Sequence, residues 1–208
     1  MILTRAEMNL RDPSAIQALR DCCDMHRNIM RLFALHAGQE PRWNAEILYR
    51  VIKSYYGMTL YIYSMETPDL RKAAWLRFGE NASSRNLSEL FGVMTPGWQA
   101  GFDLLACPSK KIRREGTNSA RIFLRTPEER TVWLRRQGEK YGFLIRSVHE
   151  ISETQVCGKK ETGRIRLHAV HFSGLLEVTD VKTFQAAYAR GIGPEKAYGL
   201  GMLLLTGR

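Results

Sequence analysis

The chain has 208 residues, of which 44% are hydrophobic, and its 31 Lys and Arg against 21 Asp and Glu give a formal net charge of +10. This composition excludes a disordered or fibrous chain, and the length suits one large domain or two small ones. No apolar run approaches the ~20 residues of a membrane helix, and the N-terminus lacks a signal-peptide pattern, so we expect a cytoplasmic protein that does not contact membranes.

Four helices are predicted from polar caps, prolines in the first turn and glycine stops. The first opens at Asp12-Pro13 and follows an apolar stripe as one long amphipathic helix to Gly38. The third opens with a capping box in which Thr126 pairs with Glu129. In chain order, the helices are expected over residues 12–38, 67–79, 126–138 and 180–191.

Segments rich in β-branched, aromatic and leucine residues indicate strands between these helices. They cover residues 1–10, 47–53, 58–65, 102–107, 121–125, 143–151, 165–178 and 202–206. A long loop is expected over residues 81–101, and an exposed basic hairpin tip over residues 108–118.

The order strand, helix, strand, strand, helix, strand occurs twice, although the first strand of the second half is weakly defined. This is the order of a ferredoxin-like unit. We therefore predict an α+β protein with two ferredoxin-like (βαββαβ) domains, residues 1–108 and 119–208, whose antiparallel sheets carry helices on one face.

The positive charge is concentrated in one stretch of the chain. Between Lys110 and Arg166 there are 15 basic and 7 acidic residues, a net charge of +8. Such a concentration suits a polyphosphate partner, because each neutralised phosphate releases condensed counterions. From charge alone, a solvated basic face explains the pattern equally well.

A glycine-rich segment near the C-terminus, from Gly191 to Gly201, matches neither a dinucleotide fingerprint nor a phosphate-binding P-loop. Two interpretations remain open. The segment is either a plain turn into the last strand or a loop whose amides face phosphate. The residues that would bind phosphate are Gly191, Gly193, Lys196, Gly199 and Gly201.

His26 continues the apolar stripe of the first helix, where spacing alone favours a packed core histidine over a functional one. Arg27 follows it and is a candidate for binding an anion. The four cysteines form no C-x-x-C pair, His168 and His171 point to opposite faces of a strand, and no carboxylates have two-metal spacing. No metal site, disulfide framework or small-molecule cofactor is therefore expected.

Several segments, taken together and in order, resemble the CasE family, the CRISPR repeat-processing endoribonucleases of type I-E systems. They are Met25-His26-Arg27, Leu48-Tyr49-Arg50, Ala106-Cys107-Pro108-Ser109-Lys110, Arg125-Thr126-Pro127-Glu128, residues 170–176 and, most specifically, residues 191–201. The resemblance covers nearly the whole chain.

The resemblance implies a tandem ferredoxin-like, RRM-like (RAMP) endoribonuclease. Such an enzyme binds the stem-loop of each CRISPR repeat, cleaves precursor CRISPR RNA at the base of the stem without a metal, and remains bound to the guide RNA as a subunit of the Cascade complex. The 2′-OH attacks the adjacent phosphate and leaves 2′,3′-cyclic phosphate and 5′-OH ends.

The same resemblance assigns residue roles. His26 matches the catalytic histidine, as general acid or base, and Lys159 and Lys160 lie in a lysine-rich loop that would stabilise the phosphorane charge. Family members carry a tyrosine three residues before the histidine, whereas this chain has Cys23, whose thiol is a candidate catalytic substitute.

RNA binding is expected from the basic hairpin and from the third helix. The residues concerned are Lys110, Lys111, Arg113, Arg114, Arg130, Arg135 and Arg136, together with Arg27 and Arg164.

Two other functions remain open. One is a non-catalytic subunit that binds an RNA hairpin, which the cysteine at position 23 suggests. The other is a single-strand RNA binder that stacks bases on Tyr49, Tyr55, Tyr56, Tyr61 and Tyr63.

Overall fold

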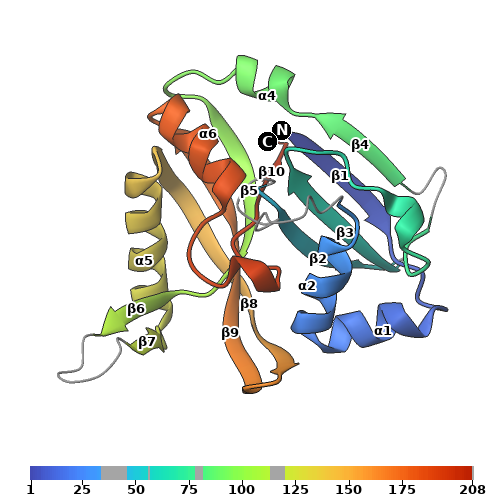
Figure 1. Ribbon diagram of the computed structural model, residues 1–208. Coiled ribbons are helices and arrows are strands. Elements are labelled where there is room, and N and C mark those ends of the chain that lie inside the picture. Colours follow the sequence, from blue (N-terminus) through green and yellow to red (C-terminus); the bar gives the residue numbers. More distant parts are fainter. Residues whose placement is uncertain (34–45, 56, 78–81, 113–119, 208) are drawn as a thin grey trace.

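The computed structural model describes residues 1–33, 46–55, 57–77, 82–112 and 120–207 (Figure 1). Its fold is mixed α+β, with two four-stranded antiparallel sheets side by side. The first sheet has the strand order β2-β3-β1-β4 and the second the order β10-β5-β9-β8. In the described ranges no helix is long and apolar enough to cross a lipid bilayer.

The strands of the first sheet are β1 (Ile2–Glu7), β2 (Leu48–Ser54), β3 (Gly57–Ser64) and β4 (Ala82–Asn86). Those of the second are β5 (Gln99–Ala106), β8 (Phe143–Lys160), β9 (Gly163–Val178) and β10 (Leu203–Thr206). A separate two-stranded sheet pairs β6 (Ser109–Ile112) with β7 (Ala120–Phe123). The helical elements are α1 (Pro13–Arg20), α2 (Cys22–Met30), η1 (Leu70–Lys72), α4 (Ser88–Gly92), α5 (Pro127–Lys140), α6 (Val181–Arg190) and η3 (Lys196–Tyr198).

The predicted first helix is two helices. The chain leaves helical geometry at Asp21 (φ −132°, ψ 110°), which ends α1 and caps α2 with its own side chain. An aspartate favours a cap because its carboxylate satisfies amides that have no partner within the helix. The predicted end at Gly38 lies outside the described residues.

The predicted helix over residues 67–79 is wrong, because in the described part of that range, residues 67–77, only η1 is helical. The following residues run extended beside β1: Arg77 donates its amide to the Glu7 carbonyl (2.8 Å), and Asn9 donates its amide to the Trp75 carbonyl (2.8 Å). These bonds, together with burial of Trp75 and Leu76, outweigh the local helical pattern.

The loop expected over residues 81–101 instead contains β4, α4 and the start of β5. Pairing with β1 makes β4 a strand, although its sequence, Ala-Ser-Ser-Arg-Asn, has no apolar alternation. The strand predicted at residues 102–107 belongs to the second sheet, where β5 pairs with β9 and β10, and not to the first. The strand predicted at residues 121–125 corresponds to β7, which pairs with β6 outside both large sheets.

One hydrophobic core joins the two sheets. It includes Leu48 and Tyr63 from the first sheet and Phe172 and Leu203 from the second. The Tyr63 hydroxyl forms a hydrogen bond with that of Tyr188 on α6. Burial raises the pKa of both phenols, so both stay neutral in the core.

A polar link also crosses between the sheets. The guanidinium of Arg50 on β2 forms an ion pair with Asp103 on β5, and the other carboxylate oxygen of Asp103 contacts His171 Nε2 on β9 at 2.6 Å. The apolar core and this link hold the two halves together.

Candidate active site

His26 lies on α2, whose buried face carries Cys22, Cys23, Met25 and Ile29. The helix begins at Asp21, where Oδ1 accepts hydrogen bonds from the amides of Cys23 (2.8 Å) and Asp24 (3.3 Å). His26 is half-buried beside the hydrophobic face.

Asp21 also joins α2 to the tip of the β8–β9 hairpin. Its second carboxylate oxygen accepts a hydrogen bond from the Lys159 amide at 3.0 Å. Gly158 makes this approach possible, because a Cβ at that position would lie 2.7 Å from Cys22 Sγ, 2.9 Å from Asp21 Oδ1 and 3.0 Å from Cys23 Sγ. The hairpin strand therefore lies directly against the first turn of the helix.

His26 on α2 and Lys160 on the hairpin both lie against Tyr198 of η3. The rings of His26 and Tyr198 meet edge to face with 6.5 Å between centroids, and Lys160 Nζ lies 5.5 Å from the centroid of the Tyr198 ring. A hydrogen bond with Tyr198 is the main cause that raises the pKa of the exposed Lys160 ammonium. Lys160 therefore stays protonated at neutral pH. A lysine must be protonated in order to neutralise a negative charge.

Tyr49 fixes the turn that carries Tyr198. Its buried ring lies beneath Gly199, and its hydroxyl donates a hydrogen bond to the Ala197 carbonyl at 3.0 Å. Gly199 has φ +77°, and a Cβ there would lie 3.1 Å from the Tyr49 ring. Glycine suits this position because a side chain would be both strained and crowded.

The glycine-rich segment packs inward and does not present all its amides to solvent. Three backbone amides of the segment donate hydrogen bonds of 2.7 Å to carbonyls within the fold: Gly191 to Ala187, Gly201 to Leu105, and Ile192 to Gly201. A Cβ on Gly193 would lie 3.0 Å from the Trp133 ring. The expectation that Gly191 and Gly201 offer amides to phosphate is therefore wrong, because both amides are used within the fold. Lys196 is half-buried at the start of η3.

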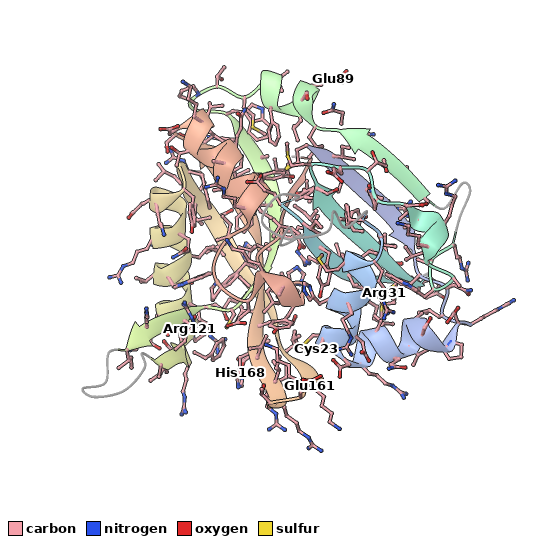
Figure 2. The ribbon with its side chains drawn as sticks, in the orientation of Figure 1. Cys23, Arg31, Glu89, Arg121, Glu161 and His168 are labelled. Atoms are coloured by element: carbon pink, nitrogen blue, oxygen red, sulfur yellow. The ribbon has the colours of Figure 1, made fainter. Side chains whose placement is uncertain are left out.

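Cys23 is buried under the β8–β9 hairpin, with 6% of its surface exposed (Figure 2). Of the described residues, Asp21, Cys22 and Cys23 bring three possible metal-ligating atoms within 4.8 Å of one another. The Asp21 carboxylate already accepts three backbone amides, and burial, followed by the Cys23 thiol, raises the pKa of Cys22 to about 12. A protonated thiol is a poor metal ligand, so these residues fit packing better than ion binding.

Most of the predicted RNA-binding cations are exposed. Lys110 and Lys111 lie on β6, Arg135 and Arg136 on α5, and Arg164 on β9. Arg27 is exposed on α2 and forms an ion pair with Asp24. Arg113 and Arg114 lie outside the described residues.

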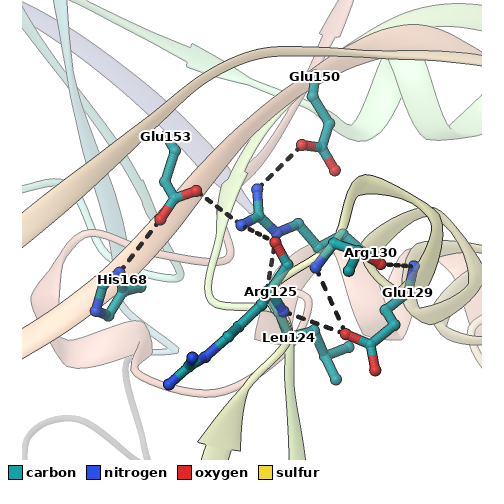
Figure 3. A network of polar contacts seen from close by, with 8 residues as sticks. Leu124, Arg125, Glu129, Arg130, Glu150, Glu153 and His168 are labelled. Carbon is teal, nitrogen blue, oxygen red and sulfur yellow. Dashed lines mark hydrogen bonds and ion pairs between the residues drawn. The ribbon is translucent and has the colours of Figure 1, made fainter.

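Arg130 is the exception, because it is buried with 5% exposure (Figure 3). Its guanidinium donates to the carbonyls of Leu124 (2.9 Å) and Arg125 (2.8 Å) and pairs with Glu150 (3.2 Å) and Glu153 (2.7 Å). The predicted RNA contact is therefore wrong for this residue. Arg130 instead ties α5 and the end of β7 to β8.

Of the five tyrosines considered for base stacking, the four that the structure describes form no shared exposed platform, and Tyr61 is half-buried. Tyr49 and Tyr63 are buried and Tyr55 is 96% exposed, while Tyr56 lies outside the described residues. The interpretation as a sheet that stacks single-stranded bases loses its support here.

Comparisons with known proteins agree with this geometry. Residues 1–206 match a family model described as CRISPR associated protein. The chain is 30% identical to the CRISPR-associated endoribonuclease Cse3 of Thermus thermophilus over 98% of both chains. The chain belongs to the Cse3 family of CRISPR-associated endoribonucleases.

Two solved structures share the fold. Cse3 bound to a 19-nucleotide RNA has a TM-score of 0.84 at 24% identity, with 99% of this chain and 100% of that one covered. A chain of a CRISPR RNA-guided surveillance complex has a TM-score of 0.71 at 23% identity, with both chains fully covered. The family expected from the ordered motifs is thus confirmed.

Three residues of this Cse3-family site were missed in the sequence. Asp21 is of a cap-forming type but lies inside an apparently continuous helix. Gly158 is an isolated glycine in a strand, a signal for close backbone approach. Tyr198 lies within the glycine-rich segment, where only the glycines and Lys196 were considered as phosphate-binding residues.

Proposed function

We propose that this protein is a metal-independent endoribonuclease that binds the repeat stem-loop of precursor CRISPR RNA and cleaves at the base of the stem. The observation that carries the proposal is that His26 on α2 and Lys160 on the β8–β9 hairpin both lie against Tyr198, in a member of an endoribonuclease family. After cleavage the protein stays bound as a subunit of the Cascade surveillance complex, in the cytoplasm, where CRISPR RNA is transcribed. The likeness to an RNA-bound Cse3 and to a chain of a surveillance complex supports both partners.

The residues suit transfer of the phosphate to the 2′-oxygen of the same nucleotide. The bond between the 2′-oxygen and phosphorus forms, the bond to the 5′-oxygen breaks, and the ends are a 2′,3′-cyclic phosphate and a 5′-OH. His26 either takes the 2′-OH proton or protonates the leaving 5′-oxygen, since imidazole titrates near neutral pH. The Lys160 ammonium neutralises the charge that develops on the phosphorane.

We also propose that each large sheet belongs to a ferredoxin-like unit. Numbered by their order in the chain, the strands of the second sheet (β5, β8, β9 and β10) lie side by side in the order 4-1-3-2. Helix α5 connects the first strand to the second, and α6 connects the third to the fourth. The first sheet has the same order, with η1 in place of the second helix. The boundary between the units then falls between β4 and β5, near residues 87–98, earlier than the expected position after residue 108.

The exposed cations would hold the RNA. Those on β6, α5 and β9 lie on the second half of the chain, and they suit recognition of a duplex through phosphates and shape. Arg121, exposed on β7, adds to the set predicted from the sequence.

Mapping RNA ends tests the proposal. Purified protein is incubated with its cognate repeat RNA in excess EDTA, and the ends of the products are identified. We expect one cut at the base of the stem, a cyclic phosphate upstream and a 5′-OH downstream. Loss of cleavage on chelation, or 5′-phosphate products, would contradict the mechanism. A stable complex with uncut RNA would favour a non-catalytic hairpin-binding subunit.

A further inference from the structure

Tyr198 lies against both groups to which the proposed chemistry is assigned. Its ring meets that of His26 edge to face, and Lys160 Nζ lies over the same ring at 5.5 Å. Tyr198 is also the first cause of the raised pKa of the Lys160 ammonium. Tyr198 thus contacts a group on α2 and a group on the β8–β9 hairpin, two elements far apart in sequence.

The backbone that carries Tyr198 is fixed on both sides. Glu195, at φ +61°, and Gly199, at φ +77°, flank the turn in left-handed conformations, and the Glu195 carbonyl accepts the Tyr198 amide at 3.0 Å. From below, Tyr49 bonds the Ala197 carbonyl. The backbone position from which the phenol projects is therefore fixed.

Lys160, in contrast to the turn that carries Tyr198, has much conformational freedom. It is an exposed side chain on a flexible stem near a hairpin tip, and an ammonium in water samples many rotamers. An ordered hydroxyl and ring restrict those rotamers, since cations are attracted both to oxygen acceptors and to aromatic faces.

We propose that Tyr198 is a positioning residue for RNA cleavage: its hydroxyl and ring hold the Lys160 ammonium beside His26, where the scissile phosphate binds. This inference rests on the proposed function. Because Tyr198 acts through Lys160, its hydroxyl affects the rate of the bond-breaking step and not the affinity for the hairpin.

The test is a double-mutant cycle with Tyr198→Phe and Lys160→Ala, followed by single-turnover cleavage at saturating protein. The phenylalanine keeps the ring and removes the hydroxyl. We expect the cleavage rate to fall about 10-fold, the low end for a lost hydrogen bond to a charged group. Hairpin affinity should stay within about twofold. In the Lys160→Ala background the same change should alter the rate less than about twofold, because the group it positions is absent.

The control is Tyr141→Phe, since Lys140 Nζ lies 5.0 Å from the Tyr141 ring in a similar pair at the end of α5. That variant should cleave at the normal rate. An equal loss from Tyr198→Phe in both backgrounds, or no loss at all, would overturn the inference. So would a fall in rate that is matched by a fall in hairpin affinity and in the thermal unfolding midpoint. Undiminished cleavage by His26→Ala would instead overturn the proposed function itself.

Discussion

The molecule has two basic hairpins that resemble each other in composition and differ in what anchors them. The β8–β9 hairpin carries Lys159, Lys160 and Arg164, and Asp21 and Gly158 hold its tip against α2. The β6–β7 hairpin carries Lys110 and Lys111. In the view of Figure 1 it lies on the opposite side of β8 and β9 from α2.

The second hairpin is anchored at its base. Arg130 bonds the end of β7 and pairs with carboxylates on β8. The tip of one hairpin is therefore held against the helix that carries His26, while the other hairpin is held at its base and carries exposed lysines. The difference teaches that contacts with neighbouring elements, and not charge, distinguish the lysine that we propose to be catalytic from those that we propose to bind RNA.

The largest expected effect tests whether the α2 side is catalytic. Replacing His26 by alanine should lower the single-turnover rate about 1000-fold or more and leave hairpin affinity within a few-fold, because proton transfer is lost while the binding surface remains. The matched control is His149→Ala, an exposed histidine on β8. Normal cleavage by His26→Ala would show that α2 is not catalytic, and the β8–β9 hairpin would then have no special role through its contact with α2.

The next effect separates the two lysines at the β8–β9 tip. Lys160→Ala should lower the cleavage rate about 100-fold, as expected for loss of one group that stabilises transition-state charge. Lys159→Ala should have a much smaller effect, because successive side chains of a strand point to opposite faces. A greater loss from Lys159→Ala would reverse the assignment.

The direction of the Lys160 pKa shift adds a pH test to this pair. Tyr198 raises that pKa, so the ammonium persists above the usual range and deprotonates only at higher pH. The wild-type rate should show no fall due to this lysine between pH 6 and 9. Lys160→Arg should retain more activity than Lys160→Ala across that range, since it keeps the positive charge.

A smaller effect tests the anchor itself. Gly158→Ala places a methyl group within 3.0 Å of Asp21 and both cysteines, so the hairpin must move away from α2. We expect cleavage to slow about 10-fold with little change in hairpin affinity, since misplacement of a catalytic group by a fraction of an ångström is costly. Gly92→Ala is the control, because a Cβ there has no neighbour within 4 Å. An unchanged rate would mean that the helix contact is dispensable.

The smallest effect on the cleavage step is expected from the other hairpin. Changing Lys110 and Lys111 to glutamine should weaken RNA binding and flatten its salt dependence by about two phosphate equivalents. The cleavage rate at saturating protein should not change. Lys182→Gln on α6 serves as the control for a lost surface charge. An unchanged salt slope would indicate that β6–β7 faces another protein and not RNA.

Much of the architecture is predictable because its signals are local. The caps at Thr126 and Asp180 and the apolar strands give α5, α6 and most of the sheet strands at nearly their observed positions. β4 and the extended segment near Trp75 were missed, since backbone pairing with β1 decides their structure and leaves no periodicity in the sequence.

The residues of the proposed site also fall into those that the sequence predicts and those that it does not. His26 and Lys160 follow from the ordered family motifs, whereas Asp21, Gly158 and Tyr198 become visible only when α2, β8 and η3 meet in space. Arg130 shows the opposite error. A basic residue on a basic helix was interpreted as a phosphate ligand, but its guanidinium is used up by two carbonyls and two carboxylates.

The shared core sets a limit on how the protein can be divided. Cutting the chain between β4 and β5 would divide this cluster, with Leu48, Tyr63 and Leu87 in the first half and Phe172 and Leu203 in the second. Each fragment would lose part of its packing, although the first keeps a second cluster that includes Ile29, Leu60 and Ile62. We therefore expect a single melting transition for the whole chain and a lower melting temperature for either half produced alone. A substitution that destabilises the second half would then also lower the fraction of molecules in which α2 is folded, even where it changes no residue of the proposed site.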